Sequence, residues 1–287
     1  MKKMIFSAGL ALGAFTCSNK VTAQKIDSLP AGKDSVHMAT IEAPVSKRTT
    51  GIHLTTAKAA PYHPSIAGIA IPAAMIGYGF IALNNPSLRD LNHSTSAEIK
   101  EDHPGFSAHI DNYLQYSPVA AVYILNAAGV HGKHNLVDRT IILGISAVLT
   151  AGSVEAVKNW SHEQRPDGSD YLSFPSGHTA TAFASAEFMR QEYKDVSIWY
   201  GVGGYAAAVA TGALRMYNNK HWLSDVVAGA GFGILSTKAA YWMYPWVQRK
   251  VVNKIFKEKS NSGTSMIMPY YNSQFRSAGL SLVFFPK

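Results

Sequence analysis

The sequence has almost no cysteine and little charge. Among its 287 residues there is one cysteine, Cys17, and 15% of the residues are charged while 47% are hydrophobic. With a single cysteine no disulfide can form within the chain, and cysteine usage gives no indication of the compartment. The shortage of charge indicates one or two domains with long stretches suited to burial or to lipid.

The basic residues also lack the pattern of a nucleic-acid-binding surface. The formal net charge is +8, but the lysines and arginines are not interleaved with aromatic residues on one face. They gather in short loops and in the run from Arg249 to Lys259, as they do beside membrane helices. We therefore expect no nucleic-acid partner, and an anionic membrane surface as the partner of this charge.

Five long stretches are almost free of charged residues, and each is close to the roughly 20 residues that a helix needs to cross a bilayer. They are Ser65–Leu83, Tyr113–Val130, Thr140–Val157, Ser197–Leu214 and Val226–Tyr244. A more polar stretch, Thr179–Met189, has the pattern of a helix at the centre of a bundle. The sequence therefore predicts an all-α, membrane-embedded six-helix bundle over residues 61–250.

The segments on either side of the bundle have a different character. Residues 1–23 have the basic start, the short apolar run and the small-residue cleavage site of a signal peptide. Residues 24–60 are polar without an apolar period, which predicts a flexible leader. Residues 251–287 combine a basic segment with two strand-forming runs, Met266–Tyr271 and Gly279–Phe285, which predict a short C-terminal β-hairpin.

Three blocks of polar residues surround the central stretch. They contain Lys158 and Arg165, then Ser176, Gly177 and His178, then Arg215, His221 and Asp225. A phosphomonoester carries nearly two negative charges, so cleaving it requires fixed cations. An arginine side chain can donate two parallel hydrogen bonds to two phosphate oxygens. A hydroxyl and an unhindered N–H at a helix start add anion-binding donors. The blocks predict a phosphate site without a metal or other cofactor.

The spacing of His221 and Asp225 predicts a hydrogen-bonded pair. Residues four apart lie on the same face of a helix, so the carboxylate is placed to accept a hydrogen bond from one ring nitrogen. That bond fixes the tautomer and leaves the other nitrogen free to attack phosphorus.

Taken together, the three blocks resemble the signature of the type 2 phosphatidic acid phosphatase and vanadium haloperoxidase superfamily. The resemblance implies that His221 is a nucleophile that forms a phosphohistidine, that His178 donates a proton to the leaving oxygen, and that Asp225 orients His221. It also implies that the phosphate is bound by Lys158, Arg165, Ser176, Gly177 and Arg215. Each fragment alone fits a helix-opening turn, a surface pair or interface anchors, but the fragments in this order do not.

One position departs from the family pattern. Leu214 stands where the family usually has a small hydroxyl residue before the arginine. One hydrogen bond to the phosphate is therefore expected either to be missing or to be supplied by Thr211 or Tyr217.

The signal peptide, the acidic connection over residues 85–112 and the strand-like tail make the chain similar to the lipid A phosphatases of Gram-negative envelopes. A lipid A phosphate is therefore the expected substrate. Undecaprenyl diphosphate and phosphatidate or phosphatidylglycerol phosphate are alternatives, because the cradle recognises a phosphate and not its lipid. A haloperoxidase and a non-catalytic lipid-phosphate binder are alternatives from other classes. Protein partners cannot be inferred.

Loop charge and topology conflict about the side of the membrane. The positive-inside tendency puts the basic end in the cytoplasm and the motifs outside, whereas a cleaved signal and six crossings put the motifs inside. A first stretch that enters and returns at Pro72, or an N-terminus that is not exported, resolves the conflict. We expect the inner membrane, with the active site facing the periplasm.

Four further features have structural interpretations. Lys238 lies within the last apolar stretch and is expected to snorkel toward the basic end of its helix. His131 and His134 have a metal-binding spacing but no nearby carboxylate or thiol in the sequence, which predicts solvated loop residues. Gly229–Gly233 resembles a dinucleotide loop, yet no strand precedes it, so helix packing is the better interpretation. The 85–112 connection is predicted to be an interfacial helix or a lid.

Overall fold

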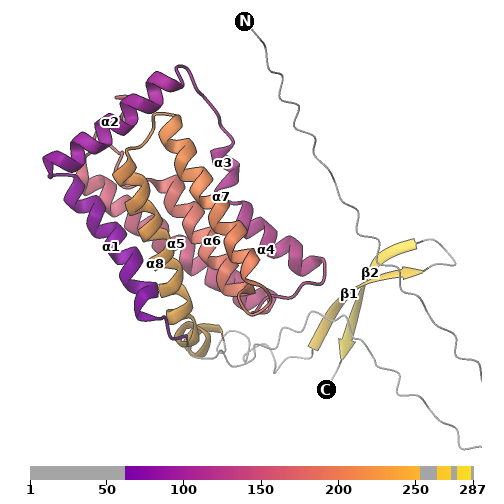
Figure 1. Cartoon of the computed structure of the whole chain (residues 1–287). Coiled ribbons are helices and arrows are strands. Elements are labelled where there is room, and N and C mark those ends of the chain that lie inside the picture. The colour runs from indigo at the N-terminus through magenta and orange to yellow at the C-terminus, as the bar shows by residue number, and fades with distance from the viewer. Residues whose placement is uncertain (1–61, 253–263, 273–276, 286–287) are drawn as a thin grey trace, which may run out of the picture. The chain divides into compact units, whose positions relative to one another are not determined.

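The computed structural model describes residues 62–252, 264–272 and 277–285 (Figure 1). The helices in these residues are α1 Ile66–Ala82, α2 Pro86–Asp102, α3 Asp111–Leu114, α4 Ser117–Ala127, α5 Leu136–Ser161, α6 Gly177–Tyr193, α7 Ile198–Tyr217 and α8 Leu223–Val247, followed by the π-helical turn η1 Gln248–Val252. The prediction of a helical architecture is confirmed. The predicted signal peptide and leader lie outside the described residues.

The described part of the chain has two helices more than the six that were predicted. Six of its helices overlap the six stretches found in the sequence, whereas α2 lies in the 85–112 connection and the short α3 begins at the end of that connection and runs into the stretch Tyr113–Val130. The connection forms its own helix because Asn85 caps it, accepting a hydrogen bond from Leu88 N at 3.2 Å, and Pro86 follows at the first helical position. Asparagine and proline were a start signal that a search for apolar stretches does not detect.

Helix α6 lies at the centre of the bundle, packed against α7 and α8, while α8 also packs on α1 and α5 (Figure 1). Small residues line α6 on its buried faces, among them Ala180, Ala182 and Ala186, each without exposed surface. Small side chains let neighbouring helices approach closely. The central position of the stretch Thr179–Met189 agrees with the prediction from its sequence.

Three glycines of α8 mark where backbones touch. A Cβ on Gly229 would lie 2.6 Å from the Ser176 carbonyl oxygen, and one on Gly233 would lie 2.1 Å from that of Ala180. Gly231 faces the other way, toward α1. The interpretation of Gly229–Gly233 as a helix-packing motif is confirmed, because only a residue without a side chain fits these contacts.

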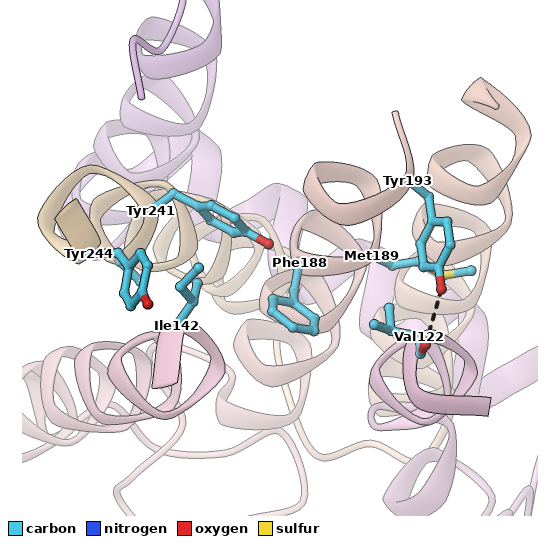
Figure 2. Packing of buried hydrophobic residues seen from close by; sticks show 8 residues of the cluster. Val122, Ile142, Phe188, Met189, Tyr193, Tyr241 and Tyr244 are labelled. Atoms are coloured by element: carbon cyan, nitrogen blue, oxygen red, sulfur yellow. Dashed lines mark hydrogen bonds between the residues drawn. The ribbon is translucent and has the colours of Figure 1, made fainter. Parts of the chain in front are cut away.

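The end of α6 that is distant from the three motif blocks packs in an aromatic cluster. The cluster contains Tyr193, Tyr241 and Tyr244 together with Val122, Ile142, Phe188 and Met189 (Figure 2). The Tyr193 hydroxyl donates to the Val122 carbonyl at 3.2 Å. Tyrosine suits this position because its ring fills the core while its hydroxyl reaches a backbone acceptor.

Two predictions about isolated polar residues are wrong. Lys238 does not snorkel: its ammonium lies 2.8 Å from the carboxylate of Glu187, which is fully buried on α6. His134 is not a solvated loop residue, because its Nδ1 lies 2.7 Å from Glu192 Oε1 and its side chain is 15% exposed. Both partners belong to α6 and are far away in sequence, and a buried charge needs such a partner.

The outer surface of the bundle carries large apolar side chains. Ile124, Val148, Val209 and Trp242 are 60% exposed or more. By length and apolarity, α5 is the one described helix that could cross a membrane; α1 and α2 would pass the same test only as a pair bent by 94°. The number of crossings in the six-span prediction therefore stays a prediction.

Near the C-terminus, β1 Thr264–Asn272 and β2 Ser277–Phe285 form an antiparallel pair in which Thr264 lies opposite Phe285. The predicted runs Met266–Tyr271 and Gly279–Phe285 fall within these bounds.

The contact between α6 and α8 yields a prediction about stability. Gly233→Ala should lower the free energy of unfolding by about 1–3 kcal/mol, because the new methyl group must displace the α6 backbone. The measurement is thermal unfolding of the detergent-solubilised protein. Gly203→Ala on α7 is the control, since its Cβ would meet no atom within 4 Å and alanine favours a helix. Equal melting temperatures for the two variants would contradict the close contact.

Candidate active site

The three polar blocks meet at one end of the bundle. Lys158 lies in the last turn of α5, His178 in the first turn of α6 and Arg215 in the last turn of α7. Because these helices run alternately up and down, the end of α5 and of α7 meets the start of α6. His221 and Asp225 follow in the turn from α7 into α8. The structure thus brings together the eight residues named from the sequence.

His221 is the most buried of the site's histidines, with 3% of its surface exposed. Arg165 Nη1 lies 3.4 Å from its Nε2. Burial, and then the positive charges of Lys158, Arg165 and Arg215, lower the pKa of His221 well below its ordinary value. The ring is therefore neutral near pH 7 and keeps a lone pair for a nucleophilic attack.

The geometry of Asp225 differs from the predicted hydrogen-bonded pair. Its Oδ2 accepts from the Ser173 hydroxyl at 2.5 Å and from Trp222 N at 2.9 Å. His221 Nδ1 lies 3.5 Å from the same oxygen, which is too long for a hydrogen bond. The reason is that α8 begins at Leu223, so His221 stands before the helix and the spacing of four does not set the contact.

Each arginine of the site is fixed by a carboxylate. Arg165 Nε lies 2.7 Å from Asp170 Oδ1, and Arg215 Nη1 lies 2.8 Å from Asp111 Oδ2. The Arg215 Nε is buried and has no hydrogen-bond partner among the described residues. A buried donor without an acceptor is costly. An anion bound beside Arg215 would satisfy it.

The remaining donors lie around the start of α6. Lys158 Nζ donates to the Leu172 carbonyl. Ser176 is the N-cap of α6, and its buried hydroxyl accepts from Thr179 Oγ1 at 2.9 Å. Gly177 opens the helix, and a Cβ there would lie 3.9 Å from Lys158 Cε, an ordinary contact. Its backbone N–H is one of the unpaired donors of a helix N-terminus, where anions bind.

Neither residue considered as a substitute for the missing hydroxyl at Leu214 contacts the site. Thr211 donates its hydroxyl to the Ala207 carbonyl at 2.9 Å. Tyr217 packs its ring against His103 and Phe106, at centroid distances of 5.2 and 5.5 Å. Their hydroxyl groups therefore give Leu214 no replacement in this conformation.

Four residues of the site were not found from the sequence. The first is Asp170, which pairs with Arg165. Ser173 binds Asp225, Asp111 binds Arg215, and Asn112 Oδ1 lies 2.8 Å from His178 Nε2. Ser173 stands two residues before Pro175 and could have been suspected from its place beside the second block. Asp111 and Asn112 come from the 85–112 connection, where nothing in the local sequence distinguishes them from other polar residues.

Comparison with known proteins agrees with this arrangement. Residues 139–249 match the model of the PAP2 superfamily, and all eight predicted site residues lie within them. This part of the chain is therefore similar to the PAP2 superfamily, which agrees with the resemblance inferred from its motifs.

Among curated proteins, the lipid A 1-phosphatase of Porphyromonas gingivalis is 36% identical over 167 residues, which cover 57% of this chain and 38% of that protein. The chain thus spans well under half the length of this relative. Two solved structures also align. The PAP2-type phosphatidylglycerolphosphate phosphatase of Bacillus subtilis is 17% identical, covering 63% of this chain and 97% of its own, with a TM-score of 0.45. LpxE of Aquifex aeolicus is 18% identical, covering 50% and 92%, with a TM-score of 0.39.

The unpaired Nε of Arg215 yields a prediction about anion binding. Arg215→Gln should weaken the binding of orthophosphate by about ten- to a hundredfold, because a charge-assisted hydrogen bond contributes roughly 1.5–3 kcal/mol. Titration calorimetry of the solubilised protein measures the affinity. Arg249→Gln, which removes an exposed positive charge beyond α8, should leave the affinity unchanged; equal losses in both variants would indicate a general charge effect instead of a specific site.

Proposed function

We propose that the chain is a membrane-bound phosphatase that removes a phosphate group from a lipid headgroup, without a metal, through a phosphohistidine intermediate. The observation that carries the proposal is the neutral, buried His221 surrounded by Lys158, Arg165 and Arg215. Such a cluster binds a dianion and leaves the nucleophile unprotonated. The similarity to the PAP2 superfamily supports the same reaction class.

In the first step the phosphate oxygens bind to the three cations and to the N–H groups at the start of α6. His221 attacks phosphorus with Nε2, the nitrogen on the side of Arg165, and a nitrogen–phosphorus bond forms. The bond from phosphorus to the lipid oxygen breaks, and His178 donates a proton to that oxygen. Burial and the nearby positive charges lower the pKa of His178 to about 4, so the proton is one that the phosphate brings with it and that its negative charge stabilises on the ring. The cations stabilise the charge that accumulates on the equatorial oxygens.

In the second step water replaces the histidine. His178, now unprotonated, accepts a proton from the water as it attacks phosphorus, and the nitrogen–phosphorus bond breaks. Orthophosphate leaves and His178 is again protonated. Asp225 lies 3.5 Å from His221 Nδ1, so its charge stabilises the imidazole ring while that ring bears the phosphoryl group.

We propose a lipid A phosphate as the substrate. The lipid A 1-phosphatase of Porphyromonas gingivalis supports this choice through its 36% identity. Undecaprenyl diphosphate and phosphatidate or phosphatidylglycerol phosphate remain alternatives because the described contacts are with groups that recognise phosphate. A phosphate binder without turnover is the alternative from another class, and the assay below distinguishes it.

We propose the inner membrane as the location, with the site on the periplasmic face. The exposed apolar side chains of α4, α5 and α7 support contact with lipid. Trp160 and Tyr171, near the site, are 64% and 58% exposed, and aromatic residues favour the boundary between hydrocarbon and headgroups. The basic residues beyond α8 support a cytoplasmic opposite face.

Mass spectrometry of the lipids from a deletion strain can identify the substrate, and complementation of that strain with variants can identify the nucleophile. A strain without the gene should accumulate the phosphorylated lipid, and its mass spectrum should lose that species when the wild-type gene is restored. Restoring His221→Ala should leave the lipid phosphorylated, because no other group can form the covalent intermediate. His131→Gln, in an exposed loop, should act as wild type.

Purified protein completes this test. Phosphate release from the identified lipid should fall by at least about 10³-fold in His221→Ala, the order of loss seen when a catalytic nucleophile is removed. Unchanged release would show that the nucleophile is misassigned. Orthophosphate binding without release from any lipid phosphate would favour the non-catalytic binder.

The lowered pKa of His221 predicts the acid side of the pH–rate profile. The ring must be unprotonated to attack, so kcat/KM should begin to fall only below the ordinary histidine pKa of about 6.5. Arg165→Gln removes one of the charges that lower this pKa, so its acid limb should move to higher pH. The profile is measured with a soluble phosphate monoester, and the limb's position is compared independently of the lower overall rate. A limb that stays in place would contradict the role of Arg165 in holding the ring neutral.

A further inference from the structure

Two adjacent residues outside the matched PAP2 segment reach into the site. Asp111 Oδ2 lies 2.8 Å from Arg215 Nη1, and Asn112 Oδ1 lies 2.8 Å from His178 Nε2. Both belong to the first turn of α3, whereas the family model begins at residue 139. One short segment therefore contacts both the arginine assigned to phosphate binding and the histidine assigned to proton transfer.

The segment is fixed by several hydrogen bonds. Asn218, at the end of α7, donates from Nδ2 to the Ala108 carbonyl at 2.7 Å and accepts from Ala108 N at 2.9 Å. Gln115 Nε2 donates to the Asn112 carbonyl at 2.9 Å. Asn218 lies three residues after Arg215, so its two hydrogen bonds tie the segment to the same end of α7 that carries Arg215. The positions of Asp111 and Asn112 relative to the site are therefore fixed.

Asp111 determines which nitrogen of Arg215 is available. The carboxylate is 1% exposed and takes Nη1, while Nε stays buried without a partner among the described residues. Burial opposes ionisation of Asp111, but the hydrogen bond and the charge of Arg215 outweigh it and lower the pKa of Asp111. An ionised carboxylate close to an anion site repels the anion and weakens its binding. Asp111 must therefore favour the reaction in another way. It does so by holding the Arg215 guanidinium in the orientation that binds the phosphate.

Asn112 holds the ring of His178 with a neutral group. An amide keeps its hydrogen-bonding capacity at every pH and does not compete for the proton that His178 must transfer. The charged groups that act on this ring come from four elements: Arg215 of α7, Asp111 of α3, Arg165 of the loop after α5, and Lys158 of α5. A carboxylate in place of the Asn112 amide would be a new negative charge at hydrogen-bonding distance.

We infer that Asp111 and Asn112 are positioning residues of the phosphatase reaction, Asp111 orienting Arg215 toward the phosphate and Asn112 orienting the ring of His178. The inference rests on the proposed function for its chemistry. Its geometric part, the orientation of Arg215, concerns anion binding and does not depend on turnover.

The Asp111 contact is tested with Asp111→Ala and Asp111→Asn. Asp111→Ala should lower kcat at least tenfold and weaken orthophosphate binding, because Arg215 loses the group that orients it. Asp111→Asn keeps an oxygen that accepts from Nη1 and should restore kcat to within about threefold of wild type. Asp102→Ala and Asp102→Asn, at an exposed position of α2, control for the lost charge and should not differ from wild type.

The Asn112 contact is tested with Asn112→Asp and Asn112→Leu. Asn112→Asp should move the alkaline limb of kcat upward by about one pH unit or more, because an opposite charge at this distance favours protonated His178. Asn112→Leu has a similar volume without the hydrogen bond and should lower kcat. Asn84→Asp, which adds the same charge on an exposed turn, should leave the pH profile unchanged.

The outcomes separate positioning from obstruction and from a failure of the proposed function. If Asp111 merely blocked the site, both Asp111 variants would bind orthophosphate more tightly and turn over faster, which would overturn the inference. Variants identical to wild type in kcat, orthophosphate affinity and pH profile would also overturn it. If wild type hydrolysed no phosphate ester while Asp111→Ala still weakened orthophosphate binding, the proposed function would fail and the orientation of Arg215 by Asp111 would stand.

Discussion

The site depends on the direct contact between the backbones of α6 and α8. Gly229 and Gly233 allow α8 to lie against the Ser176 and Ala180 carbonyls, and Ser176 N donates to the Asp225 carbonyl at 3.0 Å. This hydrogen bond joins the second motif block to the third through the main chain. The packing of α6 against α8 therefore sets the distances between the side chains of the site. A shift of α8 would move His221 and Asp225 together relative to the cations.

The positive charge of the site is balanced before any substrate binds. Arg165 is paired with Asp170, Arg215 with Asp111, and the third carboxylate, Asp225, lies among the same cations. Unpaired cations so close together would repel one another and would open the site. The carboxylates reduce the attraction for phosphate but hold each guanidinium in one place, so the site is preorganised at a moderate electrostatic cost.

The sequence predicted those parts of the structure that follow from local patterns. Five apolar stretches and one more polar stretch located six helices, and the spacing of the motif blocks identified the cations and histidines, because helix length and short motifs are properties of neighbouring residues. It gave α2 as one of two interpretations of the 85–112 connection, a helix or a lid, and the start signal of this helix is local. It did not predict the partner of Lys238 or the contacts of Asp111 and Asn112. These depend on residues that are distant in the chain, such as the 104 positions between Asp111 and Arg215, and packing alone decides them. His221 and Asp225 are intermediate: the sequence predicted that they lie close together, but α8 begins between them, so the spacing of four does not produce the predicted hydrogen bond.

The two ends of α6 are held by different means. At its start Ser176 is bonded to α8, and toward its end Glu187 is paired with Lys238 while Glu192 binds His134 and Arg139. A helix of 17 residues measures about 25 Å, slightly less than the roughly 30 Å hydrocarbon core of a bilayer. Because both ends of α6 are held by partners on other elements, the helix resists sliding along its axis. The length of α6 therefore sets how far the phosphate site at its start lies from the opposite end of the bundle.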